Sequence, residues 1–182
     1  MPKKILIITD DAGESLEIYY AKHRFEEAGW KAVIAATKRK RLNGVIHDFH
    51  PDWNTYIEKP GYLIPSDTTF ERVKVAEYAA VLLIGGRAPE FLRHDPKVIR
   101  IVQEFHRRAK WILSICHGIQ ILIAAGLVKG RTVTCYENVR LEVDYAGGRW
   151  LNKESVVDGK IITAQTWESH PQFYRDIFAR VG

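Results

Sequence analysis

The sequence predicts an α/β protein built on a doubly wound, mostly parallel sheet with helices on both faces. Two observations lead to this prediction. Short apolar runs alternate with longer segments of helical periodicity along most of the 182 residues. Several of these runs are apolar on both faces, which is typical of strands that are buried in a parallel sheet.

The amino-terminal part of the chain contains the clearest unit of strand, helix and strand. Apolar runs predict strands at Lys4 to Thr9 and at Lys31 to Thr37. Between them, apolar residues recur at helical spacing from Glu14 to Ala28, and Gly29 can adopt the left-handed conformation that ends a helix. These three elements form one repeat of a parallel sheet.

The same alternation continues to the carboxyl end. Further strands are predicted at Ala79 to Ile84, Trp111 to Ile115, Thr132 to Tyr136 and Lys160 to Ala164. Helices are predicted after Asp95-Pro96, at Ile119 to Ala125, from about Asn138 to Gly147 and after Pro171. Because the segment 119–125 is apolar all round, we expect it to be buried among other elements.

One stretch, His47 to Thr69, shows no clear periodicity. It is rich in aspartate, proline and aromatic residues, including Trp53 and Tyr62. Structureless inserts of this length in compact domains are usually lids, binding loops or contacts between subunits. We therefore interpret residues 1–182 as one domain with an insert at about 47–69.

Composition narrows the functional classes. With 46% apolar residues the chain can bury the core of one domain. The formal net charge is +5, but the densest basic run, Lys38 to Arg41, has no interleaved aromatic residues. We interpret this run as a solvated loop and expect no nucleic-acid partner.

The longest apolar stretch, Ile119 to Val128, is too short to span a membrane. Two cysteines and a start without signal-like features predict free thiols and a cytoplasmic location.

Cys116 is the candidate nucleophile. It follows a predicted buried strand and precedes a buried helix, which is the setting of a nucleophile elbow. Gly118 allows a tight turn, and the amino end of a helix lowers the pKa of a thiol that faces it. The alternative is a small buried core residue, which is the interpretation that we prefer for the mid-strand Cys135.

A nucleophile also needs a proton acceptor and hydrogen-bond donors for an oxyanion. The backbone N–H groups after Gly85 and at His117 can supply the donors. Glu14, at the start of the first helix, can share a proton with the thiol, or it can simply compensate the helix dipole. Because adjacent side chains diverge, the His117 ring is a doubtful direct base for Cys116, and a supporting hydrogen bond is equally compatible with the sequence.

A metal site has little support in the sequence. His47 and His50 flank Asp48, but two histidines three residues apart in a loop need further ligands to bind a metal. We predict no metal and no cofactor.

Taken together, these motifs resemble a known family. The chain is similar almost from end to end to the ThiJ/PfpI superfamily, which is class I glutamine amidotransferase-like, through Glu14, the run Gly85 to Glu90 and the run Ser114 to Gly118. Three further segments resemble the subgroup of plant-type glyoxalase III and archaeal intracellular protease I, namely His47 to Phe49, Trp53 to Gly61 and Trp167 to Pro171. Protein deglycases are more distant relatives.

The resemblance implies a flavodoxin-like three-layer sandwich with Cys116 as the nucleophile and Glu14 as its carboxyl partner. It further implies that Gly86 and His117 supply the oxyanion N–H groups, and that Glu90 of a neighbouring subunit orients His117. We therefore expect a homo-oligomer, as a dimer, trimer or hexamer. The residues expected to line the substrate pocket are Gly85, Arg87, Tyr136, Trp167 and His170.

Three functions are compatible with these residues. The first is conversion of a small reactive carbonyl, such as methylglyoxal to lactate, without glutathione, as in glyoxalase III and deglycases. The second is a cysteine peptidase or amidase of the PfpI type that cleaves peptides. The third is a stress protein or holdase whose Cys116 senses oxidants.

Overall fold

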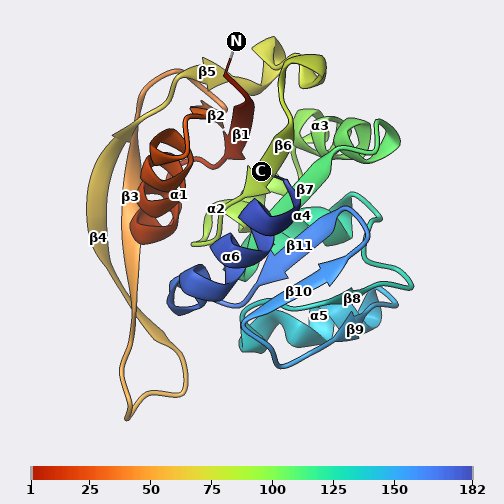
Figure 1. Ribbon diagram of the computed structural model, residues 1–182. Helices are drawn as coiled ribbons and strands as arrows, with labels where there is room; N and C mark the ends of the chain where they lie inside the picture. Colours follow the sequence, from red (N-terminus) through yellow and green to blue (C-terminus); the bar gives the residue numbers. More distant parts are fainter. Residues whose placement is uncertain (1, 182) are drawn as a thin grey trace.

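A seven-stranded sheet forms the centre of the computed structural model, which describes residues 2–181. The strand order is β10, β11, β7, β6, β1, β2, β5 (Figure 1). Their bounds are β1 Lys4–Ile8, β2 Lys31–Ala36, β5 Thr68–Thr69, β6 Ala80–Leu83, β7 Trp111–Ile115, β10 Ser155–Asp158 and β11 Ile161–Ala164. Every neighbouring pair is parallel except β10 and β11, so the predicted mostly parallel sheet is confirmed.

The apolar runs form the middle of the sheet because they are covered on both sides. In β1, Ile7 pairs with Ile34 of β2 and with Leu82 of β6. The side chain of Ile7 is 0% exposed. Burial on both faces explains why this strand lacks the alternation of a half-exposed strand.

Helices cover both faces of the sheet, as predicted (Figure 1). Their bounds are α1 Ser15–Glu27, α2 Ala88–Leu92, α3 Pro96–Arg107, α4 Ile119–Ala124, α5 Arg140–Tyr145 and α6 His170–Arg180. Helices α1 and α6 meet on one face, where the rings of Phe25 and Tyr174 lie 5.9 Å apart. Short 3-10 helices lie at Phe70–Arg72, Val75–Glu77, Cys116–Gly118, Glu137–Val139 and Trp167–Ser169. Within residues 2–181, none of the helices has both the length and the apolar character needed to cross a bilayer.

The prediction of a structureless insert at about 47–69 is wrong, because most of this segment forms a β-hairpin. Strand β3, Arg41–Phe49, pairs with β4, Tyr56–Pro65, in an antiparallel ribbon that lies along α1 (Figure 1). The pattern of β4 is hard to recognise because most of its side chains are exposed and it contains a proline. A Cβ at Gly61 would lie 2.2 Å from Ser15 Oγ, so glycine lets the ribbon approach the first turn of α1.

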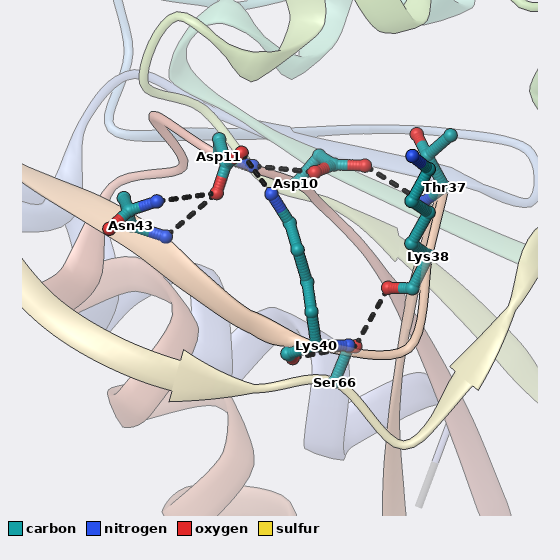
Figure 2. A network of polar contacts seen from close by, with 7 residues as sticks. All are labelled: Asp10, Asp11, Thr37, Lys38, Lys40, Asn43 and Ser66. Carbon is teal, nitrogen blue, oxygen red and sulfur yellow. Dashed lines mark hydrogen bonds and ion pairs between the residues drawn. The ribbon is translucent and has the colours of Figure 1, made fainter.

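Polar contacts fix the base of this hairpin to the end of β1 (Figure 2). Asp10 accepts a hydrogen bond from the backbone N–H of Thr37 at 2.8 Å. Asp11 accepts one from the backbone N–H of Asn43 at 2.8 Å, and it also pairs with Lys40. Because carboxyl ends of parallel strands form the usual ligand-binding edge, these contacts hold the hairpin at that edge.

The strand predicted at Thr132 to Tyr136 is shorter than expected. Only β8, Thr132–Val133, is regular, and it pairs with β9, Arg149–Trp150, outside the main sheet. From Thr134 onward the backbone turns to another partner, since its N–H donates to Thr163 Oγ1 at 2.8 Å. A side-chain acceptor therefore replaces the neighbouring strand.

Candidate active site

Cys116 lies between β7 and α4, at the strand-to-helix turn predicted from the sequence. Its backbone φ is 58°, in the left-handed region that non-glycine residues rarely adopt. Such a conformation costs roughly 1–3 kcal/mol and is concentrated at functional sites. The residue is only 4% exposed, so the sulfur is held at the turn under a cover of other side chains.

Two glycines allow the neighbouring loop to approach the sulfur. A Cβ at Gly85 would lie 2.6 Å from Cys116 Cβ, a contact that no larger residue could make. Gly86 has a φ of 75°, which glycine adopts without strain. Burial raises the pKa of the Cys116 thiol, and the backbone N–H groups of His117 and Gly86 lower it. The two predicted N–H donors therefore favour a thiolate at this sulfur, against the effects of burial and of the nearby Glu17 carboxyl.

The carboxyl group beside the thiol belongs to Glu17, which the sequence interpretation missed. Glu14 caps α1, where its Oε2 accepts a hydrogen bond from the backbone N–H of Glu17 at 2.7 Å. Glu17 lies one turn further along, and its Oε2 accepts from the N–H of Gly85 at 2.7 Å. Because the side chain of Glu14 accepts from the backbone of its own helix, it points back over the amino end of α1. The side chain of Glu17, the third residue of α1, therefore reaches the loop at Gly85. In the sequence, the three-residue spacing of Glu14 and Glu17 matches that of a capping box, and this spacing could have identified Glu14 as the helix cap.

Glu17 holds a proton more strongly than an ordinary glutamate. Burial raises its pKa well above the usual value, and the nearby Glu14 raises it further. Burial likewise raises the pKa of Glu14, to about 7. A neutral Glu17 can donate a hydrogen bond to a thiolate, whereas two negative charges at this buried point would repel each other. Burial therefore favours the neutral form of both groups, and a thiolate formed at Cys116 leaves a single negative charge that the Glu17 O–H can stabilise.

The ring of His117 does reach the sulfur, contrary to the expectation that adjacent side chains diverge. Its Nδ1 lies 3.3 Å from Cys116 Sγ. The expectation assumed an extended backbone, but the left-handed φ of Cys116 turns the two side chains toward each other. Burial lowers the pKa of His117 to about 4, with a smaller contribution from the neighbouring His47, so the His117 ring is neutral at pH 7.

Aromatic rings surround the His117 ring. Tyr136 lies 5.3 Å from it and Tyr56, from the hairpin, lies 5.8 Å from it, measured between ring centroids. Phe49, at the end of β3, packs against Tyr136 at 5.9 Å. The hairpin thus supplies part of the cover over the candidate nucleophile.

The remaining predicted residues lie in separate places. Tyr136 lines a cavity of about 320 Å³, while Trp167 and His170 line another of about 390 Å³. Arg87 is exposed and pairs with Glu58, and both residues line a third hollow. Glu90 is exposed on α2, so its predicted contact with His117 of a neighbouring subunit stays a prediction.

A doubly wound sheet with a cysteine at a strand-to-helix turn defines an α/β protein of the nucleophile-elbow class. The chain belongs to the DJ-1/PfpI family, whose sequence pattern matches residues 3–180. This confirms the predicted superfamily.

Three proteins illustrate the relationship. Protein DJ-1 homolog D of Arabidopsis thaliana is 37% identical over 187 residues, covering 99% of this chain and 48% of the plant protein. A deglycase of Thermococcus kodakarensis is 36% identical over 162 residues, covering 89% of each chain. A two-domain crystal structure from Anabaena variabilis, with DJ-1/ThiJ/PfpI-like and ferritin-like domains, matches at a TM-score of 0.85 and 26% identity. It covers 99% of this chain and 48% of that one, so the chain spans about half of both longer relatives.

Proposed function

We propose that this protein is a cysteine-dependent enzyme of the deglycase and glyoxalase III type that acts on small reactive carbonyls. The observation that carries the proposal is the placement of the Cys116 thiol between the buried carboxyl of Glu17 and the neutral ring of His117. The name of the Thermococcus kodakarensis relative, a deglycase, supports the same class of reaction.

Methylglyoxal provides a reaction in which each group has a task. The Cys116 thiolate adds to the aldehyde carbon, and the resulting oxygen takes up a proton to give a hemithioacetal. The proton on that carbon moves to the neighbouring carbonyl carbon through an enediol, with Glu17 as the acid and base. The product is a lactoyl thioester, and water then releases lactate and restores the thiol.

The backbone N–H groups stabilise the charge that forms during addition. The proposal assigns this role to the N–H groups of Gly86 and His117, because both act on the Cys116 sulfur and the substrate oxygen forms on the carbon bound to that sulfur. Loss of one oxyanion donor costs on the order of 100-fold in rate in other enzymes. These donors would serve the addition step and the hydrolysis of the thioester.

A peptidase is the second candidate, because His117 Nδ1 lies within 3.3 Å of Sγ, as in a cysteine and histidine dyad. Access favours the smaller substrate. Cys116 is 4% exposed beneath aromatic side chains, and a peptide needs an open groove on both sides of the scissile bond. A three-carbon aldehyde needs far less room.

The test compares the wild type with Cys116→Ser and Glu17→Gln on methylglyoxal and on a fluorogenic peptide. We expect the wild type to form lactate and both variants to form it more slowly by about 100-fold or more. Cys135→Ser is the matched control, since Cys135 is also a buried free thiol but its polar neighbours are Trp150 and Glu142 in place of Glu17. Peptide release that depends on Cys116, without lactate, would favour the peptidase instead.

A further inference from the structure

His47 is a buried side chain that the proposed reaction does not use. It lies on β3 opposite Glu58 of β4 and is 1% exposed. Its Nε2 lies 3.0 Å from Glu58 Oε2. Arg87 donates two hydrogen bonds to the same carboxylate, from Nε at 2.7 Å and from Nη2 at 2.8 Å. The three side chains form a continuous chain from the surface to the interior.

This arrangement determines which nitrogen of His47 carries the hydrogen. The hydrogen bonds from Arg87 hold the pKa of Glu58 at about 2, so its carboxylate can only accept. Burial lowers the pKa of His47, which leaves a neutral ring with one N–H. The hydrogen must therefore be on Nε2, and Nδ1 is an acceptor.

The acceptor nitrogen is left without a donor inside the protein. Among residues 2–181, His47 Nδ1 is buried and has no hydrogen-bond partner. Hydrogen bonds from the protein therefore fix the side chain of His47 only through Nε2 and Glu58.

The fixed ring of His47 lies against the rings that surround the thiol. It stacks on Tyr56 at 3.8 Å with an angle of 12° between the ring planes. Its edge meets the ring of His117 at 6.4 Å and 72°. Tyr56 in turn meets His117 at 5.8 Å. A rotation of the His47 ring would therefore break its stacking on Tyr56 and change its edge contact with His117.

We propose that His47, oriented by Glu58 and Arg87, is a positioning residue that keeps the His117 ring beside the sulfur of Cys116. Arg87 and Glu58 select the Nε2–H tautomer and fix the ring plane, and the stacked Tyr56 transmits that orientation to His117. The inference rests on the proposed function, since it concerns the reactivity of the same thiol. It gives Arg87 a role other than the predicted contact with substrate.

The first measurement needs no variant. In protein labelled with ¹⁵N on histidine, long-range proton and nitrogen correlations distinguish the two tautomers of each ring. We expect His47 of the wild type to carry its hydrogen on Nε2, and Glu58→Ala to populate the Nδ1–H form as well. A wild-type His47 with its hydrogen on Nδ1 overturns the proposal.

The second measurement follows the thiol without any substrate. Alkylation of Cys116 by iodoacetamide at pH 7 should slow about tenfold in Glu58→Gln and in Arg87→Met, because the outer partner that orients a histidine is lost. For turnover, kcat should fall with little change in KM. The matched control is Lys59→Ala, which breaks the exposed ion pair with Asp48 on the same two strands.

The outcomes separate this inference from the proposed function. Slower alkylation in both variants and an unchanged control support the positioning role, even when methylglyoxal is not a substrate. Unchanged alkylation in folded Glu58→Gln and Arg87→Met overturns it. Equal slowing in Lys59→Ala also overturns it, since the effect would then belong to the hairpin as a whole.

Discussion

Glu17 and Cys116 face each other across Gly85. A side chain at position 85 would meet Glu17 Oε2 at 2.8 Å and Cys116 Sγ at 3.2 Å, so one small volume separates the two acidic groups. The proposed proton exchange depends on that volume remaining empty of protein atoms.

Gly85→Ala should therefore impair the site and the fold together. The added methyl group meets the side chains of Cys116 and Glu17, and overpacking of this kind costs about 1–3 kcal/mol. We expect a lower melting temperature and slower alkylation of Cys116. Gly126→Ala is a suitable control, because an added Cβ there meets no atom within 4 Å, whereas its φ of 74° strains any residue other than glycine. It should lower stability and leave the thiol unaffected.

Glu17→Gln should separate activity from stability. Burial raises the pKa of Glu17 in the folded protein, so ionisation opposes folding as the pH rises above the ordinary glutamate value. Glutamine keeps the oxygen that accepts from Gly85 and cannot ionise. We expect activity to fall by about 100-fold or more while the melting temperature at pH 8 rises. Near pH 4, where the carboxyl is protonated in both states, the two proteins should melt alike.

Glu14→Gln tests the assignment of the two carboxyls in the same assay. The pKa of Glu14 is about 7 when folded, so its ionisation opposes folding between about pH 4.5 and 7, and this substitution should also stabilise the protein at pH 8. Because Glu14 caps α1 and Glu17 lies at the sulfur, activity should fall much less than in Glu17→Gln. A larger loss in Glu14→Gln would return the catalytic role to Glu14.

The sequence could predict the turn that carries Cys116 but not the side chain that meets it. Strands such as β1 and β7 are apolar on both faces apart from Lys4 and Ser114, and this local pattern identifies a buried parallel sheet. Glu14 and Glu17 differ only in the direction of their side chains, which the tertiary approach of Gly85 determines. The hairpin was missed for a related reason, since β4 packs along α1 with most of its side chains exposed.

The two cysteines should differ in reactivity toward mild peroxide. Burial raises the pKa of both thiols, to about 12 at Cys135, but at Cys116 the backbone N–H groups of His117 and Gly86 oppose the shift by stabilising a thiolate. We expect mass spectrometry to find sulfenic or sulfinic acid on Cys116 first, by a factor of at least about ten. Glu17→Gln should slow this oxidation. Equal oxidation of both thiols would contradict the predicted difference and weaken the oxidant-sensing function.

Glu90 allows a test of whether a second subunit completes the site. It is exposed on α2, next to Phe91, whose side chain is 47% exposed, and neither position is needed for the core. If Glu90 of one subunit orients His117 of another, each variant alone should have little activity. Cys116→Ser lacks the nucleophile, and Glu90→Gln lacks the carboxylate that orients His117. Mixed under conditions that exchange subunits, they should regain part of the wild-type activity, because some hybrid sites pair an intact Cys116 with an intact Glu90. Native mass measured on the same samples should show an oligomer. A monomer that retains full activity in Glu90→Gln would contradict the predicted shared site and place every group that the reaction needs within one chain.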